Sequence, residues 1–327
     1  MKIFITGGAG FIGRELARSL AKSGHQVICF DLGEQFVRHS HFFESVEGPG
    51  SIECAVGTLL DRSSLAQAIG DCSVVFHLAA MLGVKRTEDN RLRCLEINVN
   101  GTDNLLDACV RQRVEHVVVA SSSEVYGEPV QNPVKETDIT QGKTVYAVSK
   151  LAGEELTKGY NQLYPWLNYT IVRFFNTYGE GQVAQFVIAK FIKQVLDGQN
   201  PTVYGDGTQR RSYGHVDDVT AGLEKILANP AAYGETFNLG NSSEVYTLKE
   251  LAQRVIDTVA PDKDLTVNVM QNFDGTDREG SREIYNRVCD TTKASTVLGF
   301  APVVTVEQGI RRIANAGNIQ EDWPFNP

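Results

Sequence analysis

Short, continuously apolar runs alternate along the chain with longer stretches in which apolar residues recur every three or four positions. The short runs are typical of strands buried on both faces, and the longer stretches are typical of amphipathic helices. We expect strands at residues 2–6, 26–30, 51–56, 73–78, 114–120, 168–174 and 237–239. We expect helices at residues 11–23, 63–69, 92–112, 146–160, 184–197, 216–228 and 248–259.

This alternation predicts the α/β class, with a Rossmann-type, doubly wound parallel sheet covered by helices on both faces. After about residue 176 the pattern loosens, and segments rich in Gly, Asn and Asp separate the helices. We therefore predict a Rossmann domain over residues 1–176 and a smaller, interleaved C-terminal α/β lobe over residues 177–327. The strand expected at 237–239 would return to the first domain.

The amino-acid composition argues against several classes of binding partner. The net charge is −9 and no basic run is present, which argues against nucleic-acid binding. No apolar run approaches the roughly 20 residues that span a bilayer, and the first residues run directly into a strand pattern, so we expect neither a membrane segment nor a signal peptide. The six cysteines are scattered without a CxxC pair, so we expect reduced thiols in a cytoplasmic protein, and no metal site.

A glycine-rich loop comes after the first expected strand and opens the first expected helix. Gly7, Gly10 and Gly13 have the spacing GxxGxxG, with Phe11 and Ile12 in the first helical turn. Small residues let the backbone approach a pyrophosphate, and the helix N-terminus offers unpaired N–H groups to it. In this position the loop predicts a dinucleotide site.

Residues at the ends of later strands complete that site. Asp31 ends the second strand, where a carboxylate binds the ribose hydroxyls of NAD and repels the 2′-phosphate of NADP; we therefore predict NAD as the cofactor. Asp61 either contacts the adenine or caps the next helix. Leu78, Ala79 and Ala80 end the fourth strand and would leave room for the cofactor.

Tyr146 and Lys150 lie four residues apart on one expected helix, hence on the same face. Such a pair is common on exposed helices, but here it comes after a dinucleotide loop and a serine-rich strand end that contains Ser122. A neutral Tyr, with a pKa near ~10, is a poor base. A nearby ammonium group and an oxidised nicotinamide would favour the phenolate. We predict that Tyr146 takes a proton from a sugar hydroxyl that Ser122 holds in place.

Taken together, the motifs resemble the extended short-chain dehydrogenase/reductase family, in particular its nucleotide-sugar epimerases, dehydratases and decarboxylases. The resemblance covers nearly the whole chain. Its motifs are GGAGFIG (7–13), FHLAA (76–80), NVNGT (98–102), SSSEVYG (121–127), YAVSK (146–150), RFFNTYG (173–179), YGDGTQRR (204–211) and HVDD (215–218).

The resemblance assigns roles in catalysis and cofactor binding. Ser122, Tyr146 and Lys150 match the family's catalytic triad, in which the lysine also holds the nicotinamide ribose. Asn98 falls in the cofactor site. The chain is thus expected to bind NAD and a nucleotide-diphosphate sugar, with the C-terminal lobe holding the sugar nucleotide.

The resemblance also assigns substrate contacts. Ser123 and Asn176 match positions near the sugar and the phosphates. Arg211 and Arg287 match two arginines that grip the diphosphate, which suits the fork of a guanidinium group; the alternative is that each forms a surface ion pair. We expect His215 to be structural.

The family oxidises C4 of the sugar first, and the residues beside Ser122 decide the fate of the keto-sugar. Dehydratases of the family carry Asp-Glu where this chain has Ser123-Glu124, so the missing acid argues against dehydration. Decarboxylases carry Ser-Glu, as here, because a 4-keto uronic acid loses CO2 readily. They also carry a Pro-Arg stretch before the catalytic Tyr, which this chain lacks. Many epimerases have Asp where this chain has Ser212.

We expect 4-epimerisation as the main reaction. A UDP-glucuronate decarboxylase-like reaction, with Glu124 as a catalytic residue, and a nucleotide-sugar dehydration are the alternatives. A non-catalytic NAD-binding protein is an alternative of another class, which the joint presence of the three triad residues disfavours.

The helices expected at 92–112 and 146–160 carry apolar stripes. In relatives, the corresponding helices pair with a second subunit in a four-helix bundle, so the resemblance implies a homodimer. The alternative is that these stripes only pack against the sheet.

Overall fold

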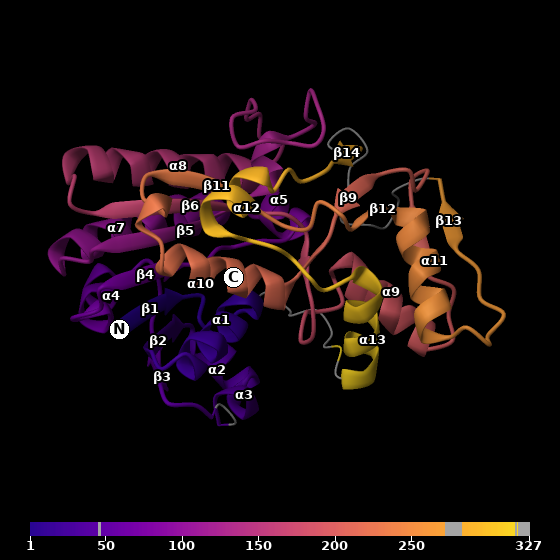
Figure 1. Ribbon diagram of the computed structural model, residues 1–327, viewed down its shortest axis with the longest axis horizontal. Coiled ribbons are helices and arrows are strands. Elements are labelled where there is room, and N and C mark those ends of the chain that lie inside the picture. Colours follow the sequence, from indigo (N-terminus) through magenta and orange to yellow (C-terminus); the bar gives the residue numbers. More distant parts are fainter. Residues whose placement is uncertain (45–46, 272–282, 318, 320–327) are drawn as a thin grey trace.

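The computed structural model describes the chain except for residues 45–46, 272–282, 318 and 320–327. Within that part, seven parallel strands form one sheet in the order β11-β6-β5-β4-β1-β2-β3 (Figure 1). The chain starts at the middle of the sheet and builds first one half and then the other, which confirms the predicted doubly wound fold. The strands are β1 (Lys2–Thr6), β2 (Gln26–Asp31), β3 (Ser51–Val56), β4 (Val74–His77), β5 (His116–Ser122), β6 (Asn168–Phe174) and β11 (Glu235–Leu239).

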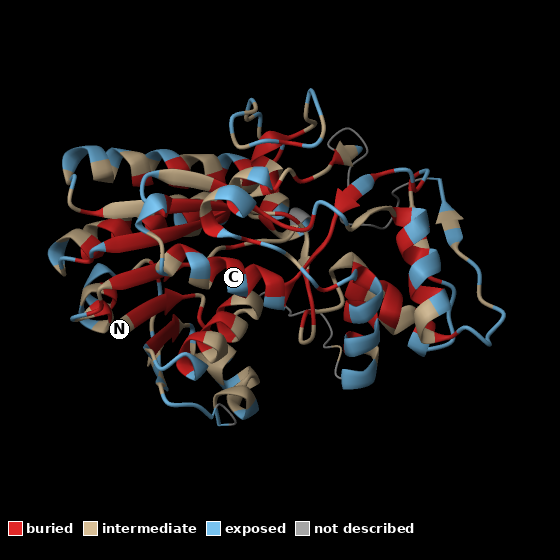
Figure 2. Ribbon diagram, in the orientation of Figure 1, coloured by how far each residue is buried: buried red, intermediate tan, exposed pale blue. Residues whose placement is uncertain are grey.

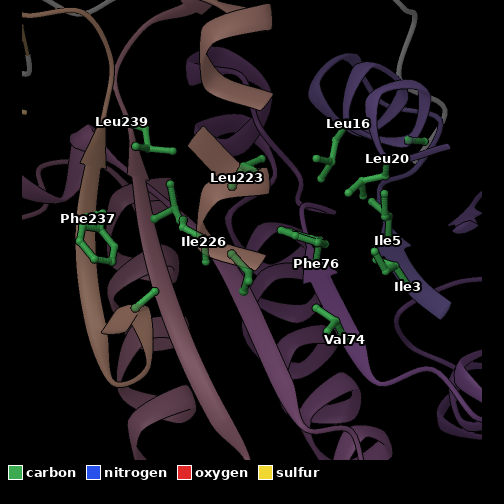
Figure 3. Close-up of a cluster of buried hydrophobic side chains, with 14 of the residues drawn as sticks. Ile3, Ile5, Leu16, Leu20, Val74, Phe76, Leu223, Ile226, Phe237 and Leu239 are labelled. Atoms are coloured by element: carbon green, nitrogen blue, oxygen red, sulfur yellow. The ribbon is translucent and has the colours of Figure 1, made fainter. Parts of the chain in front are cut away.

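Helices cover both faces of this sheet. On one face, α1 (Phe11–Lys22), α10 (Val216–Leu227) and α12 (Thr292–Leu298) pack on alternate strand residues such as Ile3 and Ile5 (Figure 3). On the other, α4 (Arg62–Ile69) and α7 (Gly101–Arg111) pack on a cluster that contains Phe4, and α8 (Val145–Leu163) lies beside α7 and β5. Ile3, Phe4 and Ile5 are all fully buried, because successive side chains point to opposite, covered faces. That is why the strand reads as a continuous apolar run.

A second cluster of elements forms a smaller lobe with its own apolar core (Figures 1 and 2). Helices α9 (Val187–Leu196), α11 (Leu248–Val259) and α13 (Val306–Ala316) surround that core. Short strands complete the lobe: β8 (Thr202–Tyr204) pairs with β13 (Asn268–Met270), β9 (Arg210–Ser212) lies between β12 (Val245–Thr247) and β14 (Asn286–Arg287), and β7 (Thr177–Tyr178) pairs with β10 (Gly214–His215).

No helix among the described residues is long and apolar enough to cross a membrane.

Two features differ from the sequence pattern. The single helix expected at 92–112 is α6 (Arg91–Leu95) and α7, joined by a π-helical turn, Glu96–Asn100. A single π turn, with i→i+5 hydrogen bonds, is rare and short, and the pattern of apolar residues predicts one continuous α-helix. The sequence pattern also did not predict helices α2 (Gly33–Arg38), α3 (Ser40–Glu44), α5 (Val84–Asp89), α12 and α13, the 3-10 turns Ser123–Tyr126 and Pro230–Ala232, or the short strands of the second lobe.

Candidate active site

The glycine loop leaves the N-terminus of α1 open. Gly7 has φ +69°, a conformation that favours glycine, and its N–H donates to Phe30 O at 2.9 Å. Gly10 precedes the helix without any side-chain cap, so the first N–H groups of the helix lack the usual partner. A Cβ on Gly13 would lie 2.1 Å from Gly7 O. The loop thus packs against its own helix so tightly that only glycine fits, as a pyrophosphate cradle requires.

Asp31 lies at the end of β2, beside this loop. Its carboxylate accepts hydrogen bonds from Ala9 N at 3.0 Å and from Leu32 N at 2.8 Å. Burial raises the pKa of Asp31 to about 6, although these two bonds act in the opposite direction. Asp31 is therefore mainly ionised at neutral pH and retains lone pairs that suit ribose hydroxyl donors.

The other expected cofactor residues lie around the same loop. Phe11 and Ile12 form the first turn of α1 and are partly exposed, and so are Leu78, Ala79 and Ala80 after β4. A Cβ on Gly7 would come within 2.7 Å of Ala79 N, so the segment after β4 borders the loop directly.

Asp61 and Asn98 have clear partners in the protein. Asp61 caps α4, accepting from Ser63 N at 3.0 Å and Ser64 N at 3.1 Å. The capping alternative is thus realised, and a contact with adenine stays a prediction. The Asn98 amide accepts from Met81 N at 2.7 Å and donates to Ser149 Oγ at 2.9 Å. It ties the segment after β4 to α8, and its direct contact with NAD stays a prediction.

Ser122, Tyr146 and Lys150 are brought together between the end of β5 and the first two turns of α8. The Ser122 side chain lies close enough to the Tyr146 hydroxyl to act on its pKa. Lys150 Nζ donates to Ala120 O at 2.8 Å and lies 5.9 Å from the centroid of the Tyr146 ring. The arrangement offers a hydroxyl pair to a substrate and a buried ammonium group behind it.

The electrostatics of this triad differ in part from expectation. Burial raises the pKa of Tyr146, and the charge of Glu124 adds to this; the Ser122 side chain and the Arg287 charge act to lower it. The charge of Lys150 is not among the main effects on the Tyr146 pKa in the protein alone, so its part in forming the phenolate stays a prediction. Burial lowers the pKa of Lys150 itself to about 8. The protein alone therefore keeps Tyr146 protonated.

The two expected phosphate arginines lie side by side on the small sheet. Arg211 on β9 and Arg287 on β14 occupy paired positions, so their side chains share a face. Arg211 Nη2 lies 3.2 Å from Glu283 Oε1 and also donates to Ile284 O. Both arginines are buried, which excludes the alternative of a surface ion pair.

Glu124 faces this pair of arginines from the first lobe. Its Oε1 atom lies 2.7 Å from Nη1 of Arg287, but the contact lacks hydrogen-bond geometry. Among the described residues, Nε of Arg287 has no hydrogen-bond partner. An incompletely satisfied, buried guanidinium is costly unless an anion completes it, so this position suits an anionic ligand.

Ser123, Asn176 and His215 are the remaining residues that the sequence analysis considered. Ser123 is buried in the 3-10 turn after β5, and Asn176 lies in the link from β6 to β7, where its carbonyl accepts from Gly214 N at 3.2 Å. Buried His215 accepts from Asp217 N through Nδ1 and lies 3.0 Å from Glu180 Oε2 through Nε2. It caps α10, in agreement with the expected structural role.

Sequence reasoning missed two buried charges beside the triad, Glu154 and Arg173. Each has a signal in the chain: Glu154 comes four residues after Lys150 on the same helix face, and Arg173 opens one of the family motifs. Glu283, the partner of Arg211, carries no recognisable signal.

Known proteins are similar to this chain in both sequence and fold. Residues 3–240 match the NAD dependent epimerase/dehydratase family. The chain is 35% identical to a UDP-N-acetyl-alpha-D-glucosaminuronate decarboxylase of Bacillus cytotoxicus, over 95% of both chains. It is similar in structure to a UDP-glucuronic acid 4-epimerase from Bacillus cereus in complex with UDP-glucuronic acid and NAD (TM-score 0.85, 27% identity, 97% of this chain and 98% of that chain). A UDP-N-acetylglucosamine 4-epimerase from Methanobrevibacter ruminantium has a TM-score of 0.84 at 26% identity, over 97% of both chains. This chain therefore belongs to the NAD-dependent epimerase/dehydratase family.

Proposed function

We propose that this enzyme inverts the C4 centre of a nucleotide-diphosphate sugar through a 4-keto intermediate. The observation that carries the proposal is the convergence of Ser122, Tyr146 and Lys150 at the carboxyl edge of the sheet, two strands from β1 and the open N-terminus of α1 that follows it. A proton acceptor for a sugar hydroxyl thus lies at the same edge of the sheet as a dinucleotide cradle, as oxidation of an alcohol requires. The 4-epimerases among its structural neighbours support the same reaction.

NAD is the cofactor, and the residues present fit it. The clash that a Cβ at Gly13 would make with Gly7 O shows a cradle reserved for close backbone approach. Asp31 supplies a carboxylate at the ribose position. When bound there, NAD would supply reversible hydride exchange with C4 of the sugar.

The protein side of the reaction is proton transfer and orientation. Ser122 holds the C4 hydroxyl, and Tyr146 takes its proton and later gives it back. Because burial raises the pKa of Tyr146, the phenolate needs nearby positive charge, which Lys150 and an oxidised nicotinamide ring would supply. Inversion then requires only that the keto-sugar present its other face before reduction.

Dehydration is disfavoured by the residues next to Ser122. Elimination of water needs one group to protonate the leaving hydroxyl and another to remove the proton at C5. Ser123 has no acidic function and is buried, and Glu124 already faces Arg287. We therefore do not assign this site to a dehydratase.

Decarboxylation is the second candidate, because a specific contact favours it. The pair places the carboxyl group of Glu124 next to the guanidinium group of Arg287. That guanidinium group can bind a substrate carboxylate or keep Glu124 ionised. A 4-keto uronic acid is a β-keto acid and loses CO2 without a further cofactor. The 35% identity to a decarboxylase of a UDP-sugar acid supports this alternative.

We further propose that the lobe over residues 177–327 binds the sugar nucleotide. Arg211 and Arg287 would hold the diphosphate, because two adjacent guanidinium groups match its oxygens. Asn176 would contact the phosphates and Ser123 would border the sugar. Glu283 and Glu124 balance the two arginine charges in the free enzyme.

We also propose a homodimer formed through a four-helix bundle. Apolar side chains remain exposed along the relevant helices: Leu92 is 85%, Val148 49% and Leu163 70% exposed. A second copy would cover them with its α6, α7 and α8 helices. The six unpaired cysteines suit the reducing cytoplasm, where we propose that the enzyme resides.

The experiment is incubation of the enzyme with NAD and, separately, UDP-glucose, UDP-N-acetylglucosamine and UDP-glucuronate, followed by mass spectrometry and NMR of the products. A product of unchanged mass with inverted C4 supports the epimerase, and loss of CO2 supports the decarboxylase instead. Tyr146→Phe should bind NAD normally and lose turnover by at least ~100-fold. Full turnover in that variant would contradict the assignment of Tyr146 as the base.

A further inference from the structure

A buried ion pair lies directly behind the catalytic triad. Arg173 on β6 donates to both carboxylate oxygens of Glu154 on α8, from Nη2 at 2.7 Å and from Nε at 2.9 Å. The side chains are only 7% and 1% exposed. This bidentate geometry fixes the guanidinium plane of Arg173 relative to the carboxylate plane of Glu154.

The pair belongs to a network that reaches the triad from two sides. Ser121, the neighbour of Ser122 on β5, donates to Glu154 Oε1 at 2.5 Å. Arg173 Nη1 donates to the Tyr126 hydroxyl at 2.9 Å, and that hydroxyl donates to Asn238 on β11 at 2.8 Å. The network therefore joins α8 to three strands of the sheet at the level of the reacting groups.

Glu154 is also the negative charge nearest in sequence to Lys150 on its helix, one turn further along. Residues four apart on a helix are neighbours on its surface. Cys94 from α6 and Glu154 are the two groups that raise the pKa of Lys150 against the effect of burial. Burial also raises the pKa of the Cys94 thiol, so it stays neutral at pH 7.

Two further titratable groups near Lys150, His77 and Tyr146, carry no charge at neutral pH, whereas Arg173 is charged and is paired with Glu154 itself. Burial, followed by the Lys150 charge, lowers the pKa of His77 on β4 to about 3. Tyr146 is protonated, because burial raises its pKa. Glu154 is thus the carboxylate that offsets the cost of a buried ammonium group at this site.

Stability alone does not explain such a pair, since a buried ion pair is often no more stabilising than apolar residues of the same volume. We propose that Glu154 is a positioning residue for the reaction: held by Arg173 and Ser121, it fixes α8 against the end of β5 and keeps Lys150 charged. The inference rests on the proposed role of Lys150 in catalysis and extends it to a residue that touches neither substrate nor cofactor.

The test measures the pKa of Lys150 directly, in the full-length enzyme labelled with 13C at the lysine Cε. The resonance is assigned by its absence from Lys150→Met. In the wild type it should titrate near 8. In Glu154→Gln the pKa should fall by about one unit, as expected for loss of a neighbouring buried charge.

Kinetics provide a second readout that a purely structural role would not change. A fall of one unit makes Lys150 about threefold less protonated at pH 7.5. Turnover of Glu154→Gln should therefore drop about threefold in kcat at pH 7.5, with KM unchanged, and recover toward pH 6.5. Glu155→Gln is the matched control, because Glu155 is exposed and pairs only with Lys158 among the contacts of the described residues; both readouts should match the wild type.

Two further variants separate charge from folding. Glu154→Asp keeps the charge and should keep the pKa of Lys150 near 8. If Glu154→Gln does not fold, Glu154→Gln/Arg173→Met replaces both partners of the ion pair, a change that buried pairs tolerate, and it should lower the Lys150 pKa in the same direction. An unchanged Lys150 pKa in a folded protein without Glu154 would overturn the proposal. A lowered pKa in an enzyme that yields no epimer would support it while refuting the proposed reaction.

Discussion

Lys150→Met should make the free protein slightly more stable at neutral pH while abolishing turnover. Lys150 is a buried ammonium group whose pKa is lowered from 10.5 to about 8 by burial. Methionine has a similar length and carries no charge. The substitution therefore removes a charge that the fold tolerates only because catalysis uses it.

The magnitude can be worked out from the pKa. A fall of about 2.5 units, at about 1.4 kcal/mol per unit, corresponds to about 3 kcal/mol of destabilisation when Lys150 is charged. Lys150→Met also removes the hydrogen bond from Nζ to Ala120 O, and leaving that carbonyl unpaired costs about 1–2 kcal/mol. The variant should thus be about 1 kcal/mol more stable at pH 7.

The difference in stability between the wild type and Lys150→Met changes sign with pH. Below pH 8 Lys150 is protonated in both the folded and the unfolded wild type, so the full cost is present. Between pH 8 and 10.5 only the unfolded state retains the proton, and the wild type gains about 1.4 kcal/mol per pH unit relative to the variant. By pH 10 the wild type should be the more stable of the two.

The assay is urea unfolding of both proteins, followed by circular dichroism from pH 7 to 10, without NAD. Lys158→Met, at an exposed site on the same helix, should show a difference from the wild type that is nearly constant with pH. Parallel stability curves for the wild type and Lys150→Met would refute the reasoning, because they would mean that Lys150 titrates alike in the folded and unfolded states.

Three further predictions concern the cofactor site and the second lobe. Gly13→Ala places a Cβ 2.1 Å from Gly7 O and should abolish NAD binding in fluorescence titrations; retained affinity would show that the loop can relax. The pKa of Asp31 is about 6, so calorimetry should find NAD affinity falling as the pH drops from 7 to 5 and the carboxylate is protonated. The Asp31→Asn variant should bind NAD weakly and without this pH dependence. Equal pH profiles of NAD affinity in the variant and the wild type would contradict the role of Asp31 in NAD binding. Thr247→Ala removes the capping box of α11 and should cost about 1 kcal/mol in urea unfolding; an unchanged midpoint would argue against that cap.

The sequence predicted the chemistry of the site better than its electrostatics. Gly7, Gly13 and Asp31 were recognisable because each position in a strand–loop–helix unit has one physical requirement. Tyr146 and Lys150 were recognisable by helical spacing. Their pKa values were not, because both depend on burial, and that of Tyr146 depends also on Arg287, which is more than a hundred residues away in the chain.

The alternating pattern by itself determined the class of fold, since a strand that is apolar at every position must be covered on both faces. It also determined the dinucleotide loop, because a missing Cβ is a property of the residue alone. Only the tertiary structure decided that Glu124 faces Arg287 and that Arg211 lies beside it. It alone decided the π turn at Asn98 as well. The contacts of Arg287 with Glu124 and Arg211 join segments far apart in sequence. No periodicity relates these partners, so only packing brings them together.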